Sequence, residues 1–224
     1  MKTVAIIPAY NEEARIADAV RDAARFVDAV VVTDDCAKDA TAARAHEAGA
    51  YVLRHIINRG QGAALQTATD FAIEKLGADI VVHFDADGQM MGEEIPMMIE
   101  PITNGEADIV LGSRFLGKKA NMPLSRLVTL RLALLFTYVV SGIRTTDTHN
   151  GFRALSRDAA KKLRITLDRM AHASEILDLI VVKKLRYVER PVTIRYSEAT
   201  LAKGQKFSGS FAIVKDFLKK RMLG

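Results

Sequence analysis

The 224-residue chain contains one cysteine, Cys36, and no tryptophan. One cysteine excludes an internal disulfide and argues against a cluster of thiolate metal ligands, which fits a reducing compartment. The basic residues are not interleaved with aromatic ones, so the chain lacks a stacking platform for nucleic acid, and we expect no nucleic-acid partner. The net charge of +5 is small for this length and favours phosphate-bearing ligands or an acidic lipid surface.

Long hydrophobic runs are absent as well. The longest predominantly apolar run, Leu132 to Ile143, lies between Arg131 and Arg144 and is much shorter than the roughly 20 residues that cross a bilayer. No charged and apolar leader precedes the first strand pattern, so we expect no secretory signal and a cytoplasmic protein. Hydrophobic residues make up 49% of the chain, which excludes a disordered protein and suffices for one core in a single domain, residues 1–224.

The first half of the chain alternates short apolar runs with stretches of helical periodicity. We expect buried strands at 4–7 and 29–32, further strands at 51–53, 80–84 and 108–111, and helices at 12–26, 39–48, 63–76 and 93–102. This alternation predicts an α/β fold with a mostly parallel central sheet and helices on both faces. The second half lacks this rhythm: we expect helices at 124–143, 174–184 and 211–221, the last one basic, and extended chain at 188–196.

Ligands of such sheets bind beyond the carboxyl ends of the strands, and the strongest signal lies there, between Phe84 and Gln89. Asp85 and Asp87 are two residues apart, so in extended chain their carboxylates point to the same side. They can converge on a hard divalent cation and leave coordination sites for phosphate oxygens and water, as Mg²⁺ prefers. Gln89 adds a neutral oxygen and completes the predicted set of metal ligands. The alternative is a solvated acidic turn around Gly88.

Two more strand ends carry polar clusters. Pro8 to Glu12 follow the first strand, where their polar atoms would face a ligand, although Asn11 could simply cap the next helix. Asp34 and Asp35 follow the second strand and are suited to bind a ribose hydroxyl or a base edge; a simple turn is the alternative. Three polar strand ends in one sheet favour a binding site over three unrelated turns.

Two other features have a plainer interpretation. The segment 60–62, Gly-Gln-Gly, lacks the third glycine of a dinucleotide fingerprint, so a cradle for a sugar donor or a turn fits better than an NAD site. His83 lies inside a strand pattern, and we expect it in the core or directly behind the site.

Together these segments resemble glycosyltransferase family 2. The resemblance is carried, in the family's order and at similar spacings, by residues 8–12, 34–35 with 39–41, 85–89, 112–115 and 147–153. It covers about residues 2–200 and is closest to the branch of dolichol-phosphate or polyprenyl-phosphate mannose synthases. It implies a GT-A fold in which a nucleotide-sugar-binding part, residues 1–115, precedes an acceptor-binding part, residues 116–224. The transmembrane helices usual at the carboxyl end of this branch are missing from the sequence.

The resemblance also implies roles for individual residues. The nucleotide sugar would be bound by Pro8, Tyr10, Glu12, Asp34, Asp35, Asp85, Ala86, Asp87 and Arg114. Asp85, Asp87 and Gln89 would hold Mg²⁺ or Mn²⁺ against the diphosphate. The acceptor would be bound by Arg126, Arg131 and His149.

The chemistry of sugar transfer fits these residue types. The nucleoside diphosphate leaves with growing negative charge, which a metal ion held by Asp87 and its neighbours, together with Arg114, would stabilise. A lipid phosphate acceptor is already anionic and needs no strong base. A sugar hydroxyl needs a carboxylate that accepts its proton, and Asp147 and Glu175 are the candidates. The family precedent is inversion at the anomeric carbon.

We therefore predict an inverting, metal-dependent transferase that uses a UDP- or GDP-sugar and a polyprenyl-phosphate-type acceptor. The alternatives are a family 2 enzyme acting on a glycan hydroxyl, and a non-catalytic nucleotide-sugar-binding partner of a membrane glycosyltransferase. Residues 124–143 are apolar but too short to span, and Lys118, Lys119, Arg126 and Arg131 precede or lie along them. We expect peripheral attachment to the anionic inner face of the cell membrane, with a small membrane protein as the alternative anchor.

Overall fold

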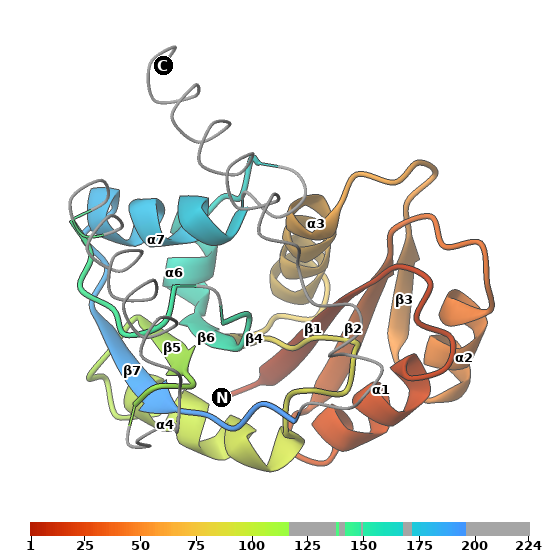
Figure 1. The fold of residues 1–224 in the computed structure, drawn as a ribbon, viewed down its shortest axis with the longest axis horizontal. Helices are drawn as coiled ribbons and strands as arrows, with labels where there is room; N and C mark the ends of the chain where they lie inside the picture. The colour runs from red at the N-terminus through yellow and green to blue at the C-terminus, as the bar shows by residue number, and fades with distance from the viewer. Residues whose placement is uncertain (117–137, 139–141, 149, 168–171, 196–224) are drawn as a thin grey trace, which may run out of the picture.

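The computed structural model describes residues 1–116, 138, 142–148, 150–167 and 172–195. A seven-stranded sheet in the order β3-β2-β1-β4-β6-β5-β7 forms the centre of the molecule (Figure 1). The strands are β1 (Thr3–Ala9), β2 (Ala29–Asp34), β3 (Tyr51–Arg54), β4 (Ile80–His83), β5 (Ile109–Ser113), β6 (Arg153–Ser156) and β7 (Tyr187–Pro191). The helices are α1 (Ile16–Ala24), α2 (Thr41–Glu47), α3 (Gln61–Glu74), α4 (Ile95–Thr103), α6 (Arg157–Lys162) and α7 (His172–Val182), with a 3-10 turn η1 (Gly92–Glu94).

The sheet is mostly parallel, which confirms the expected fold class. β1 pairs in parallel with β2 and β4, β2 with β3, and β5 with β7. β6 is antiparallel to both of its neighbours, β4 and β5. Strands from both halves of the chain therefore share one sheet, and β6 brings its first residue to the edge where β4 and β5 end.

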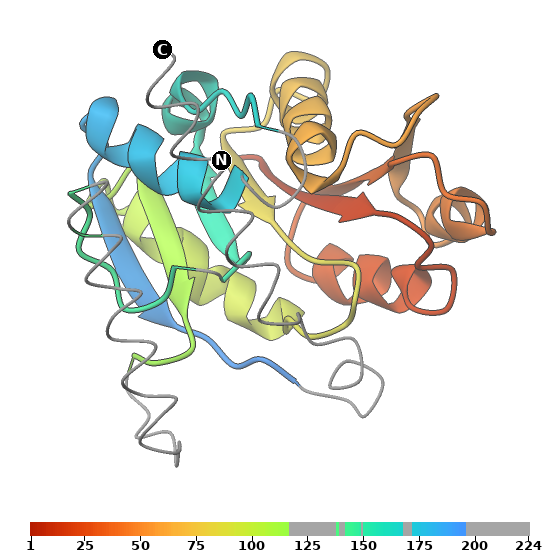
Figure 2. The ribbon, with the colours of Figure 1, turned by 45° about the horizontal axis from the view of Figure 1, so that its top comes forward.

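Helices cover both faces of the sheet, as the sequence predicts. In β1, Ala5 and Ile7 belong to one hydrophobic core, whereas Val4 and Ile6 belong to the other, and all four are fully buried. A strand covered on both faces reads as a continuous apolar run for this reason. α1 and α4 lie on one face, and α3, α6 and α7 lie on the other (Figures 1 and 2).

Some elements differ from the sequence-based expectation. α1 begins at Ile16 and not at residue 12, because Asn11 adopts a left-handed backbone conformation, with φ of 54°. Its Oδ1 accepts the backbone N–H of Lys38 (2.9 Å), so Asn11 closes a turn and does not cap the helix. β6 and α6 were not predicted. The predicted helices at 124–143 and 211–221 lie largely or wholly outside the described residues.

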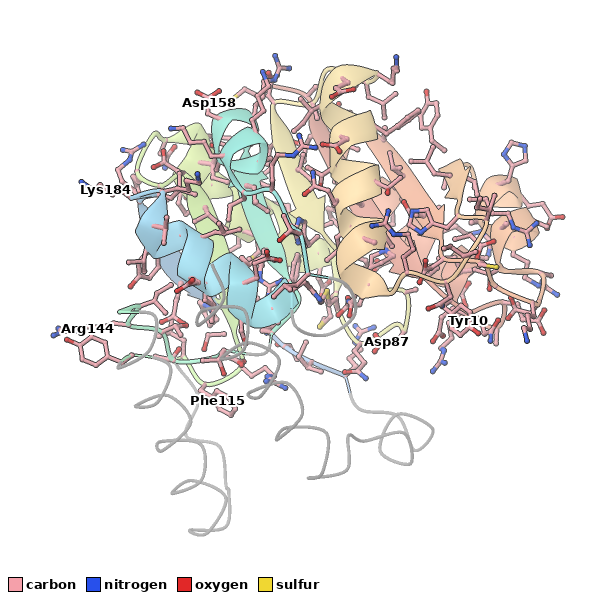
Figure 3. All side chains as sticks on the ribbon, turned by 90° about the horizontal axis from the view of Figure 1, so that it is seen from above. Tyr10, Asp87, Phe115, Arg144, Asp158 and Lys184 are labelled. Atoms are coloured by element: carbon pink, nitrogen blue, oxygen red, sulfur yellow. The ribbon has the colours of Figure 1, made fainter. Side chains whose placement is uncertain are left out.

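The fold places the informative residues along one edge. The carboxyl ends of β1, β2, β4 and β5 lie at the same edge of the sheet, since these strands run in one direction. Tyr10, Asp87 and Phe115, which follow three of them, lie along this edge in Figure 3. Any site built from strand ends must therefore be sought here.

Candidate active site

A pocket of about 550 Å³ opens at the carboxyl ends of β1, β2 and β4. Its lining includes most of the residues predicted to bind a nucleotide sugar, namely Pro8, Tyr10, Glu12, Asp35, Asp85, Ala86 and Asp87. It also includes Asn58, Gly60 and Gln61, which precede or begin α3. This volume lies in the range of small-molecule sites.

Asp34 does not line this pocket, although the sequence grouped it with Asp35. Its side chain is buried; Oδ1 accepts the backbone N–H of Ala37 (2.7 Å), and Oδ2 lies 3.1 Å from Arg54 Nε. The predicted contact between Asp34 and a nucleoside is therefore not supported. Asp34 instead holds the turn after β2 against β3.

Asp35 shapes the wall of the pocket. Its carboxylate accepts the backbone N–H groups of Arg59 (2.9 Å) and Gly60 (2.6 Å) and pairs with His55 Nδ1 at 2.7 Å. Its backbone oxygen accepts Asn58 Nδ2 (3.1 Å). One buried carboxylate thus fixes residues 55–60. Gly60 and Gln61 line the pocket, as the predicted donor cradle at 60–62 requires, whereas no role was predicted for residues 55–59.

Asp85 and Asp87 form the acidic centre of the pocket. Burial, together with the negative charge of Asp87, raises the pKa of Asp85 to about 6, although Arg153 acts in the opposite direction. Asp85 Oδ1 accepts a hydrogen bond from Gln61 Nε2 (3.1 Å), and Asp87 Oδ1 accepts the backbone N–H of Gln89 (3.0 Å). Two carboxylates that repel each other in a partly dry site are stabilised by a bound cation.

Asp85 and Asp87 fit a divalent cation whose remaining ligands are oxygen atoms of the substrate and of water. Among the described residues, no three His, Cys, Asp or Glu side chains come together to form a metal cage. Mg²⁺ is commonly held by one or two carboxylates, with water and substrate phosphates as the remaining ligands. Asp85 and Asp87 supply such a pair. Gln89, the third predicted ligand, lines a separate small cavity that also includes Asp85.

Arg114 faces that second cavity, which has a volume of about 60 Å³. Its guanidinium donates from Nε to Asp147 Oδ2 (2.7 Å) and from Nη2 to Asp147 Oδ1 (2.8 Å), and its backbone N–H donates to the same carboxylate (3.1 Å). Asp147 is 1% exposed, whereas the Arg114 side chain is 30% exposed. The buried carboxylate therefore fixes the guanidinium and leaves part of it open to a ligand.

The two predicted general bases are both engaged in the protein. Asp147 uses both oxygens on Arg114, so the geometry favours a positioning role over proton abstraction. Glu175, in α7, accepts the backbone N–H groups of Thr166 (3.0 Å) and Leu167 (2.8 Å) and the Thr166 hydroxyl. Glu175 lines neither of the two cavities, and its contacts hold residues 166–167 against α7.

Arg153 places a buried positive charge behind these carboxylates. It is 2% exposed at the start of β6, and its Nη1 has no hydrogen-bond partner in the described part of the chain. Burial lowers its pKa to about 10, although Asp85 and Asp147 raise it. His83, its partner across β4 and β6, is buried as expected, and burial holds the pKa of His83 well below its ordinary value. No role was predicted for Arg153, although it ends the segment 147–153 that carries part of the family resemblance.

The structure describes none of the three residues predicted to bind the acceptor. Arg126, Arg131 and His149 lie outside the described residues, as do Lys118 and Lys119. Neighbours of His149 are described on both sides: Thr148 and Asn150 are both buried.

Comparisons with known proteins identify one family. Residues 4–164 match the family model described as Glycosyl transferase family 2. A UDP-N-acetylglucosamine–dolichyl-phosphate N-acetylglucosaminyltransferase of Methanococcus voltae is 34% identical over 97% of this chain and 95% of its own length. A polyprenol monophosphomannose synthase of Mycolicibacterium smegmatis is 30% identical over 93% of this chain and 82% of its own.

Solved structures share the fold at lower identity. Glucosyl-3-phosphoglycerate synthase of Mycobacterium tuberculosis, in complex with Mn²⁺, UDP-glucose and phosphoglyceric acid, has a TM-score of 0.61 and 20% identity. The match covers 96% of this chain and 76% of that one. The UDP complex of the same enzyme gives a TM-score of 0.63 at 22% identity. The architecture is the GT-A fold that the sequence predicts.

Proposed function

Because the chain belongs to glycosyl transferase family 2, we propose that it transfers a sugar from a nucleotide-diphosphate sugar to a polyprenyl-phosphate-type acceptor. The family and the named relatives identify the chain as a glycosyltransferase that uses nucleotide-sugar donors. The observation that carries the finer proposal is the acidic pair Asp85 and Asp87 in the large pocket, where Asp85 also lines the small cavity of Arg114. The acceptor class is supported by the names of relatives, which act on dolichyl phosphate or polyprenol phosphate.

The large pocket suits the nucleotide part of the sugar donor. Tyr10, 44% exposed at its rim, offers an aromatic face to a base, and Glu12 lies beside it, paired with Arg15 at 2.7 Å. Asp85 and Asp87, which line the same pocket, would hold Mg²⁺ or Mn²⁺ against the diphosphate. When bound, the cation neutralises charge on the leaving phosphates. One of the two named solved structures binds Mn²⁺ with UDP-glucose, which supports a divalent ion here.

Arg114 would complete the catalytic machinery beside the leaving phosphate. Its guanidinium is held by Asp147 before any substrate arrives, so no reorganisation is needed when charge develops on the leaving phosphate. Since Asp147 and Glu175 are both engaged, the site favours an acceptor that is already anionic over a sugar hydroxyl that needs a base. Direct attack by a phosphate oxygen on the anomeric carbon, with departure of the nucleoside diphosphate, would invert the configuration.

Nucleotide release from a panel of UDP- and GDP-sugars with Mn²⁺ tests this function. We expect release that depends on polyprenyl phosphate and stops in EDTA. Release that requires a short glycan instead would favour the glycan-hydroxyl alternative. Metal-dependent nucleotide binding without turnover on any acceptor would favour a non-catalytic binding partner.

Gly151 offers a test of the acidic centre that removes no charged group. A Cβ at this position would lie 2.8 Å from Asp85 Oδ2 and 3.2 Å from the Met90 methyl carbon. Gly151→Ala should therefore displace the Asp85 carboxylate and weaken Mn²⁺-dependent nucleotide binding by about tenfold or more, measured by calorimetry. Gly105→Ala controls for a destabilising alanine remote from the site: a Cβ there meets no atom within 4 Å, but the φ of 72° strains alanine, so stability should fall while nucleotide affinity is unchanged. Equal affinities in wild type and Gly151→Ala would contradict the assignment of Asp85.

We also propose a single domain in which residues 1–115 bind the nucleotide sugar and 116–224 supply the acceptor side. Among the described residues, no helix has both the length and the apolar character that crossing a bilayer requires. We propose peripheral attachment to the inner face of the cell membrane, through residues 118–144 or through a small membrane protein. Flotation with anionic vesicles tests direct attachment: co-flotation that weakens as salt rises supports it, and no co-flotation at low salt excludes it.

A further inference from the structure

Asn150 carries a hydrogen-bond donor without an acceptor. Its side chain is 6% exposed, and its Oδ1 accepts the backbone N–H of Phe152 (2.9 Å). Because Oδ1 must be the atom that faces this N–H, the opposite position of the amide is fixed as Nδ2. In the described part of the chain, the buried Nδ2 has no partner. A buried donor of this kind costs free energy unless a ligand or water satisfies it.

The small cavity beside Asn150 suits an oxygen-bearing anion. Asn150, Arg114 and Gln89 line it, and its volume is about 60 Å³. About 10–15 Å³ of such space is enough for one water, so the cavity admits a small tetrahedral group such as a phosphate. Arg114 supplies a guanidinium and Asn150 an amide N–H, and both groups bind anionic oxygens well.

The cavity also lies where a phosphate is needed. It shares Asp85 with the large pocket, so it is the next space beyond the proposed position of the metal and the diphosphate. Resting on the proposed function, we propose that Asn150 is a further substrate-binding residue, which donates from Nδ2 to a phosphate oxygen beside Arg114. This oxygen belongs either to the leaving phosphate of the nucleotide or to the phosphate of the acceptor, and binding experiments distinguish the two.

Asn150→Asp is the informative variant. It keeps an Oδ1 acceptor for Phe152 and replaces the Nδ2 donor by an anionic oxygen. Asn104→Asp makes the same change of charge at the exposed end of α4 and serves as the control. Asn150→Ser provides a second variant without added charge, because a serine hydroxyl can still accept the N–H of Phe152 while Nδ2 is lost.

Two measurements identify the source of the phosphate. If the oxygen belongs to the leaving phosphate, Asn150→Asp should weaken Mn²⁺-dependent binding of UDP or GDP by about tenfold or more, and leave UMP or GMP binding unchanged. If it belongs to the acceptor, nucleotide binding should be unchanged and the KM for polyprenyl phosphate should rise by about the same factor. Asn150→Ser should change whichever of these two quantities Asn150→Asp changes, and in the same direction. Asn104→Asp should leave both the nucleotide affinity and the KM for polyprenyl phosphate unchanged.

Failure of this inference is separable from failure of the proposed function. A wild-type protein that binds no nucleoside diphosphate with Mn²⁺ would overturn the proposed function. A wild-type protein that binds and turns over normally, with Asn150→Asp and Asn150→Ser unchanged in both constants, would overturn the role of Asn150 alone. In that case the Nδ2 donor is satisfied by water.

Discussion

Replacing Asp85 by asparagine is expected to abolish sugar transfer and, at neutral pH, to make the metal-free protein more resistant to unfolding. The first effect follows from the loss of a carboxylate ligand for a hard cation. The second follows from the raised pKa of Asp85, about 6 against an ordinary 3.8, which arises from burial and from the charge of Asp87. The folded protein thus holds an ionised carboxylate in an unfavourable place, and a neutral amide of the same shape relieves this cost.

The sign of the pH dependence follows from the same shift. Between about pH 4 and pH 6, the folded state keeps a proton on Asp85 that the unfolded chain has released. Protonation of Asp85 therefore stabilises the folded state relative to the ionised form. This stabilisation is fully present below pH 4 and is lost as the pH rises through 6. Above pH 6 the cost is on the order of 1–3 kcal/mol, since each pKa unit corresponds to about 1.4 kcal/mol and the group is partly exposed.

Thermal unfolding with and without Mn²⁺ measures both effects. At pH 7.5, metal-free Asp85→Asn should melt several degrees above the metal-free wild type, because about 1 kcal/mol shifts a protein of this size by about 2–4 °C. Mn²⁺ with nucleoside diphosphate should raise the Tm of the wild type but not that of the variant. A variant that melts lower than the wild type, or that still responds to Mn²⁺ with nucleotide, would contradict the role given to Asp85.

The fold was largely predictable because its central strands are covered on both faces. β1, β2 and β4 are continuous apolar runs, and such runs are conspicuous in a sequence. β6 escaped prediction for the opposite reason. It has four residues and begins with a buried arginine, Arg153, whose charge is offset by that of Asp147 nearby and by that of Asp85, which is distant along the chain. A local sequence pattern does not indicate that tertiary contacts bury a charged residue in a strand.

The site was predictable where a single strand end supplies the chemistry. Asp85 and Asp87 follow β4 and line the pocket, as their spacing indicated. Adjacent carboxylates such as Asp34 and Asp35 could not be distinguished from the sequence, because β2 directs one toward Arg54 and the other toward residues 59–60. Likewise, nothing in the sequence indicates that Asp147 pairs with Arg114, 33 residues earlier.

Arg114→Ala is expected to lower kcat by about a hundredfold or more, with a smaller change in the affinity for nucleotide alone. The expected loss reflects a fixed guanidinium that acts mainly when negative charge develops on the leaving phosphate. The variant also leaves Asp147, 1% exposed, as a buried carboxylate without its arginine, so some loss of stability is expected. Asp147→Asn should lower kcat in the same direction, because the guanidinium loses the charged partner that orients it.

A double-mutant cycle separates positioning from direct catalysis. If Asp147 acts only through Arg114, the double variant Arg114→Ala/Asp147→Asn should be no slower than Arg114→Ala alone. The matched control lies at the other end of β5, where Arg186 makes a similar pair with Asp108 at 2.8 and 3.2 Å. Arg186→Ala should leave kcat within about twofold of the wild type, since this pair is remote from the strand ends that form the site.

The outcomes of the cycle distinguish the two roles of Asp147. Losses that multiply in the double variant would mean that Asp147 contributes independently of Arg114, and proton abstraction from an acceptor hydroxyl would then explain it. That result would also move the acceptor from a lipid phosphate toward a glycan, because only a hydroxyl needs a base. Single and double variants that are equally slow would leave Asp147 as the group that orients Arg114, with an anionic acceptor attacking unaided.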